Sequence, residues 1–115
     1  MKVKLAQVVG SVEPLGKLMS NPMPAATAFR CAKVLKAVQS ELETYDEARK
    51  TLIEKYGEDG EMKPESKDWD KFIKEMNTLL DEEINVNGKK IKADSLSKIE
   101  VAPTDLLSLD WLIKE

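Results

Sequence analysis

The fold of this chain is decided by residues 24–56, which read PAATAFRCAKVLKAVQSELETYDEARKTLIEKY. Apolar residues recur there at alternating spacings of three and four, interrupted only at Arg49: Ala28, Cys31, Leu35, Val38, Leu42, Tyr45, Leu52 and Tyr56. That spacing is typical of one face of an amphipathic helix, here about nine turns long. Because so long a helix is stable in water only when its apolar face is covered, we expect the rest of the chain to cover it.

The segment after the long helix predicts a partner for it. Residues 58–67 are polar and contain Gly60 and Pro64, which is typical of a loop. Residues 66–84 again carry apolar side chains at helical spacing. Because a loop of about ten residues joins the two helices, we expect them to pack as an antiparallel hairpin.

The remaining segments are expected to cover this helical hairpin. Residues 5–19 have helical apolar spacing with a break expected near Pro14, and Pro103 opens a short C-terminal helix. Asn87-Gly88 lies between two short segments in which polar and apolar residues alternate, and this pattern predicts a small β-hairpin. The predicted fold class is mainly α (α+β): a long antiparallel helical hairpin covered by N- and C-terminal helices, with a small β-hairpin. We expect a single helical domain over residues 1–115.

The composition argues against an enzyme or a metal protein. The chain has 18 basic and 21 acidic residues, one cysteine and no histidine. The absence of histidine removes the commonest general base and the commonest metal ligand, and a zinc site needs several cysteines or histidines. We therefore expect no catalytic residues, no metal and no cofactor. Cys31 is predicted to be a buried structural thiol. No apolar run is long enough for a membrane span, so we expect no membrane partner.

The basic residues are unevenly distributed. Residues 1–40 hold six basic residues against one acidic, whereas residues 41–115 hold twelve against twenty. The start of the long helix is therefore the expected anion-facing region, because its free N–H groups and dipole also favour negative charge. The candidate ligand-binding residues are Lys17, Thr27, Arg30, Lys33 and Lys36. The alternative is that these cations pair with the acidic second half.

Two other features bear on partners. The run Lys89, Lys90 and Lys92 is interpreted as edge-strand lysines that deter aggregation, and a pI of about 5.2 argues against nucleic acid as the partner. The apolar end Trp111, Leu112 and Ile113 is a candidate protein interface. We expect a homodimer that buries this end; the alternative is a monomer whose terminal helix folds back onto the N-terminal one.

The chain resembles a family of small uncharacterised proteins encoded by tailed bacteriophages and prophages. The segments that carry the resemblance are residues 1–5 (MKVKL), 30–36 (RCAKVLK), 41–43 (ELE), 47–57 (EARKTLIEKYG) and 103–109 (PTDLLSL). The resemblance implies expression in the host bacterial cytoplasm and supplies no catalytic residues.

Two functions are therefore expected. The first is a non-enzymatic phage accessory protein that binds a protein partner stoichiometrically, in assembly or against the host. The alternative is a counter-defence protein that sequesters an anionic nucleotide signal at the basic site near the start of the long helix.

Overall fold

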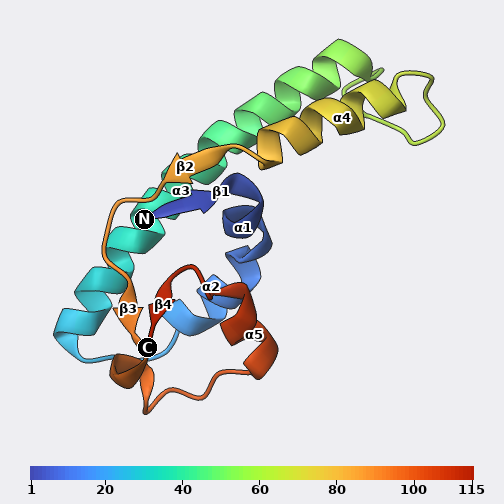
Figure 1. The fold of residues 1–115 in the computed structure, drawn as a ribbon. Helices are drawn as coiled ribbons and strands as arrows, with labels where there is room; N and C mark the ends of the chain where they lie inside the picture. The colour runs from blue at the N-terminus through green and yellow to red at the C-terminus, as the bar shows by residue number, and fades with distance from the viewer.

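One helix sets the length of the molecule. In the computed structural model, which describes all 115 residues, α3 (Ala25–Tyr56) is a continuous helix of 32 residues (Figure 1). At 1.5 Å per residue it is about 48 Å long, close to the longest dimension of the molecule, 51 Å. The predicted long helix is confirmed. None of the helices is both long and apolar enough to cross a bilayer.

The C-terminal half of α3 forms an arm with α4 (Trp69–Leu80), which runs back antiparallel to it (Figure 1). Near the tip, the Lys55 ammonium lies 3.6 Å from the Glu75 carboxylate. The predicted helical hairpin is confirmed, but its second helix is shorter than residues 66–84. The helix begins at Trp69, with Asp68 as its N-cap residue, because residues 64–68 first make turns.

The N-terminal half of α3 is covered by a compact body. Its first part comprises β1 (Lys2–Lys4), α1 (Leu5–Gly10) and α2 (Val12–Met19). The break between α1 and α2 falls at Ser11 rather than near Pro14. Pro14 lies in the first turn of α2, where a proline interrupts no helical hydrogen bond.

The second part of the body comes from the C-terminal third of the chain. It comprises β2 (Glu83–Asn85), β3 (Ile91–Lys92), the 3₁₀ helix η1 (Ala93–Leu96), α5 (Pro103–Ser108) and β4 (Ile113–Lys114). As predicted, Pro103 is the first residue of its helix. Of the terminal helices, α1 packs on α4 and α5 packs on α2, so they do not cover the α3–α4 hairpin as a whole; the arm projects beyond them (Figure 1).

The structure corrects the predicted β-hairpin at Asn87-Gly88. The segments on either side of this turn pair with the two ends of the chain: β2 is antiparallel to β1, and β3 is parallel to β4. A two-residue hairpin would place Lys89 opposite Val86, which is fully buried. In the structure Val86 is instead buried in the core and Lys89 is exposed at the surface. The α+β class itself is confirmed.

One apolar cluster holds the body together. Its buried members are Val3, Val8, Leu15, Leu18, Cys31, Val34, Val38, Val86, Ile91, Leu96, Leu109, Trp111 and Leu112. The cluster joins both ends of the chain to α3, and the prediction that Cys31 is buried is confirmed. Burial raises the pKa of its thiol, which keeps the unreactive protonated form.

Candidate functional site

The outer side of α3 carries three cations in a row. Arg30, Lys33 and Lys36 follow one another at spacings of three, so they share one face of the helix. The opposite side of the same turns carries Val34 and Val38, which are fully buried in the core. This packing fixes the rotation of α3 and directs the three cations outward.

A loop brings further lysines to the same side. Residues 87–90 lie between buried Val86 and buried Ile91, so both ends of the loop are anchored. Gly88 has a φ of +124°, and a Cβ on it would lie 3.0 Å from Cγ2 of Val34. A glycine is therefore needed for the loop to pass this close to α3. The loop then presents Lys89 and Lys90 beside the helix.

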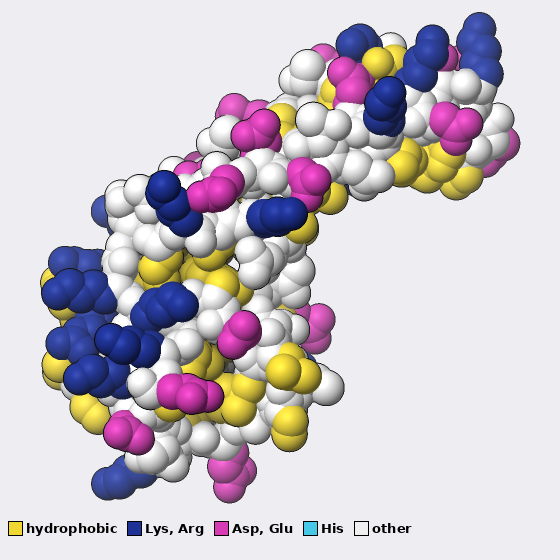
Figure 2. Space-filling model, in the orientation of Figure 1, with side chains coloured by type: hydrophobic (Ala, Val, Ile, Leu, Met, Phe, Trp, Pro, Cys, Tyr) yellow, Lys and Arg dark blue, Asp and Glu magenta, His cyan; other side chains and the backbone are white.

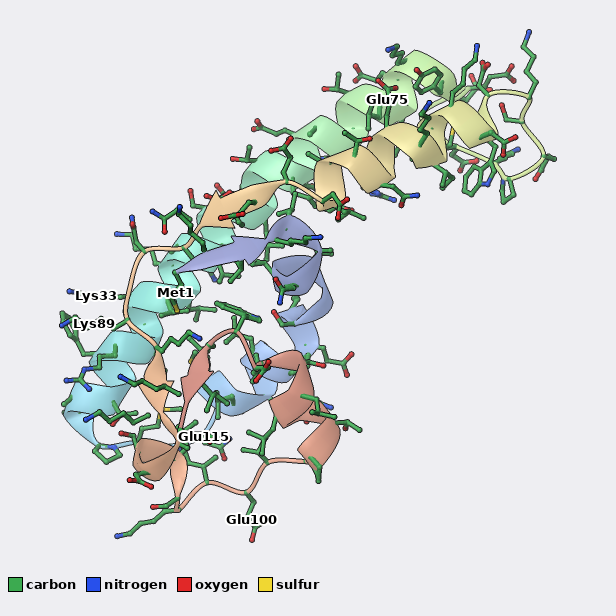
Figure 3. All side chains as sticks on the ribbon, in the orientation of Figure 1. Met1, Lys33, Glu75, Lys89, Glu100 and Glu115 are labelled. Carbon is green, nitrogen blue, oxygen red and sulfur yellow. The ribbon has the colours of Figure 1, made fainter.

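Two adjoining cavities define the site. One, of about 780 Å³, is lined by residues of α3 and of the 87–89 loop, and the second, of about 690 Å³, by residues of α3, β3, β4 and the same loop. They share Arg30 and Lys89. We call their cations the basic face: Arg30, Lys33, Lys36, Lys89, Lys90, Lys92 and Lys114. Figure 3 shows Lys33 and Lys89 projecting to the same side of the body.

The basic face has no acidic partners. The ion pairs of the structure use only Lys4, Lys17, Lys50 and Lys55. No aspartate or glutamate lines either of the two cavities. Figure 2 shows the resulting cluster of Lys and Arg side chains at one edge of the body. Unpaired positive charges held this close together repel one another, so an anion bound there would relieve the repulsion.

An aromatic ring lies within the basic face. Phe29 is 62% exposed and lines the larger cavity. The Lys33 ammonium lies 4.8 Å from the centre of the ring, a cation–π contact one helical turn along α3. The site thus offers a flat apolar surface among its charges.

The structure brings together three of the five predicted ligand-binding residues. Arg30, Lys33 and Lys36 belong to the basic face, but Lys17 does not, since it lies 3.6 Å from Glu13 and 4.0 Å from Asp105. Thr27 is buried and lines a separate cavity. The predicted pairing of cations with acidic residues therefore describes Lys17 and fails for the other three cations.

Sequence reasoning missed four cations of the basic face. Lys89, Lys90 and Lys92 are visible as a run, but the local pattern alone favours a protective role at a strand edge. Their proximity to α3 depends on the close approach of Gly88 to Val34 and on the packing of β3 against α3, which no local pattern signals. Lys114 joins the face because β4 pairs with β3.

The predicted interface at the C-terminus is enclosed by the chain itself. Trp111 and Leu112 are buried in the core, and Ile113 is half-buried in β4. The helix before them, α5, packs on α2. The terminal helix thus folds back on the N-terminal part, which removes the reason to place an interface at these three residues.

The side chains of the basic face supply positive charge and N–H donors. No three histidine, cysteine, aspartate or glutamate side chains come together as metal ligands. Comparison of the chain with protein-family models, with curated proteins and with solved structures finds no match in any of the three. The fold and the site define a small α+β protein with seven clustered cations on one side of its body.

Proposed function

We propose that this protein acts by stoichiometric, non-enzymatic binding of an anion that carries several phosphates. The observation that carries the proposal is the basic face: seven cations from α3, the 87–90 loop, β3 and β4, with no carboxylate among them. Arg30 can hold a phosphate through two parallel hydrogen bonds, and the lysines around it add charge without fixed geometry.

The composition of the lining favours an extended anion over a small enclosed ligand. Small-molecule sites are mostly apolar with a few polar groups. The larger cavity instead carries four cations, Arg30, Lys33, Lys36 and Lys89, among its nine lining residues. Such a surface gains its affinity from many charge contacts, so binding should weaken steeply as salt rises.

Titration of inorganic polyphosphate into the protein, followed by calorimetry at low and at physiological salt, tests the proposal. The test variant is Arg30→Ser/Lys33→Ser/Lys89→Ser, which removes three charges from the basic face. The control is Arg49→Ser/Lys71→Ser/Lys74→Ser, which removes the same charges from exposed positions on the arm. We expect one-to-one, salt-sensitive binding that only the test variant loses. Equal loss in both variants, or no binding to the unchanged protein, would refute it.

A nucleotide is one anion of this class. Mass spectrometry of cyclic nucleotides and ADP-ribose derivatives after incubation with the protein would distinguish sequestration from turnover. We propose sequestration, so the nucleotide should be recovered unchanged. The resemblance to phage proteins makes signals of bacterial defence systems the first nucleotides to test, and it supports a counter-defence role in the host cytoplasm.

A protein partner is the second candidate, and a different surface favours it. Leu107 is 77% exposed on α5, and Leu106 and Val12 are also exposed on α5 and the adjoining α2. Apolar side chains grouped at the surface are typical of contact sites. A phage accessory role in assembly or against the host would use this surface, and Leu107→Asp should then abolish the function while leaving polyphosphate binding intact.

The homodimer stays a prediction, now with these exposed residues as its candidate contact. Sedimentation at micromolar concentration is the measurement. A species twice 12.9 kDa that Leu107→Asp converts to monomer would support it, whereas a 12.9 kDa species in the unchanged protein would reject it.

A further inference from the structure

The exposed ring of Phe29 lies among the cations of the basic face, where it could contact a flat apolar part of a ligand. Its side chain adds nothing to the core, because the neighbouring turn buries Cys31 and Val34 instead. The Lys33 ammonium lies 4.8 Å from the centre of the ring, and this cation–π contact favours the observed orientation of the ring. One face of the ring is thus in contact with a cation, while 62% of the residue remains exposed.

A nucleobase matches this arrangement. Proteins that bind single strands combine a positively charged surface for the backbone with aromatic side chains on which bases stack. Phe29 and Arg30 are adjacent in sequence and line the same cavity, so a base on the ring would place its phosphate within reach of the cations. Inorganic polyphosphate would use the cations and leave the ring unused.

The extent of the basic face favours a chain over a mononucleotide. Arg30 and Lys36 are separated by about 9 Å along the axis of α3. The two cavities meet at Arg30 and Lys89, and the second continues over Lys90, Lys92 and Lys114. A mononucleotide carries its phosphates at one point, whereas a strand carries one per nucleotide and can contact both cavities. A duplex would hide the faces of its bases from Phe29.

The acidic pI does not oppose this ligand, because the negative charge lies elsewhere. Residues 41–82, which form the arm, hold fourteen acidic and seven basic residues. The molecule is 51 Å long, and charges at physiological salt are screened beyond about 8 Å. A strand on the basic face therefore interacts with the local positive charge.

We propose that the basic face binds single-stranded nucleic acid, with several phosphates against its cations and one base stacked on the open face of Phe29. This proposal rests on the proposed function, because it identifies the anion. It revises the expectation from composition that nucleic acid is not a partner.

The experiment is fluorescence anisotropy with a labelled 12-nucleotide single strand of mixed sequence, with the matching duplex, ATP and inorganic polyphosphate as competitors. Phe29→Ala removes the ring, and Phe29→Trp retains a stacking surface. Leu107→Ala removes a still more exposed apolar side chain away from the basic face. Thermal unfolding of each variant checks that it is folded.

We expect Phe29→Ala to weaken single-strand binding by roughly 5- to 150-fold, the usual loss of one stacked base. Phe29→Trp and Leu107→Ala should bind as the unchanged protein does, and Phe29→Trp should show additional quenching of tryptophan fluorescence by the strand. Polyphosphate affinity should be the same in Phe29→Ala and in the unchanged protein. Lys89→Ala should weaken the binding of both ligands. For the strand, the slope of log affinity against log salt concentration should fall in magnitude by about 0.7, which corresponds to one phosphate contact.

The outcomes separate the two proposals. If polyphosphate binds but Phe29→Ala does not change the affinity for the strand, the single-strand proposal is overturned and the anion-binding function still stands. The single-strand proposal fails equally if ATP or the duplex competes as strongly as the unlabelled strand. If no anion binds, the proposed function itself fails.

Discussion

The indole Nε1–H of Trp111 donates a hydrogen bond of 3.2 Å to Oγ of Ser11, across 100 residues of sequence. Both residues are buried, and the Ser11 hydroxyl in turn donates to the carbonyl oxygen of Val8 at 3.0 Å. The contact joins the C-terminal segment to the break between α1 and α2. It satisfies the one polar atom that a buried tryptophan brings into the core.

Ser11→Ala should lower the free energy of unfolding by about 1–3 kcal/mol, because it leaves the buried indole N–H without a partner. Urea unfolding measures the change. Thr44→Ala, which removes an exposed hydroxyl from α3, should change it by less than about 0.5 kcal/mol. In a Trp111→Phe background the Ser11→Ala effect should shrink, because the donor is then absent. An undiminished effect there would show that the hydroxyl acts through some other contact.

Gly88→Ala should destabilise the protein by about 1–3 kcal/mol, since the residue has a φ of +124° and the added Cβ would meet Val34. Gly16→Ala is the matched control. Gly16 lies inside α2 with open space around its Cα, so alanine there should raise stability by about 0.5–1 kcal/mol. Thermal unfolding compares the two, and equal shifts in the same direction would contradict the argument.

Glu75 should make the stability of the arm depend on pH. The Tyr56 hydroxyl beside it and then the Lys55 ammonium hold the pKa of its carboxyl below the usual value. Because the folded-state pKa is the lower one, the stabilisation is present above the unfolded pKa of about 4.3 and is lost as the pH falls through the folded value.

The measurement is the unfolding free energy of Glu75→Gln against that of the unchanged protein between pH 7 and pH 2. The difference should be small, since the pair is partly exposed, and should favour the unchanged protein at pH 7 and vanish at pH 2. Glu43→Gln, an exposed change on α3, is the control and should show no such trend. A difference that is constant over the whole range would refute this prediction.

Cys31 should resist thiol reagents in the native protein. It is buried, and burial raises its pKa, so the reactive thiolate is both scarce and enclosed. Labelling should be slow in buffer and fast in urea. Cys31→Ser should cost about 1–3 kcal/mol, because a hydroxyl replaces the thiol in the apolar core, whereas Cys31→Ala should cost less. Rapid labelling without denaturant would indicate a functional cysteine instead.

The helices could be predicted from the sequence because their signals are local. The apolar spacing along residues 24–56 predicted α3 almost to the residue, and the polar loop after Gly57 predicted an antiparallel partner. Pro103 marked the start of α5 in the same way. Hydrogen bonds between residues four apart and side chains three or four apart decide these features, so a short window of sequence contains them.

The strand pairing could not be predicted, because it is decided by distant partners. Asn87-Gly88 has the local signal of a hairpin, yet the chain ends offer β2 and β3 better partners, since these bury Val86 and leave Lys89 exposed. The approach of this loop and of β3 to α3 brings Lys89, Lys90 and Lys92 beside Arg30, and the pairing of β4 with β3 adds Lys114. The sequence by itself determined the cations of α3 and the helices that carry them. Only the tertiary structure decided that four more cations join them, that Lys17 lies beside Asp105 instead, and that Trp111 is buried in the core. Each of these features depends on contacts between segments that are far apart in the chain.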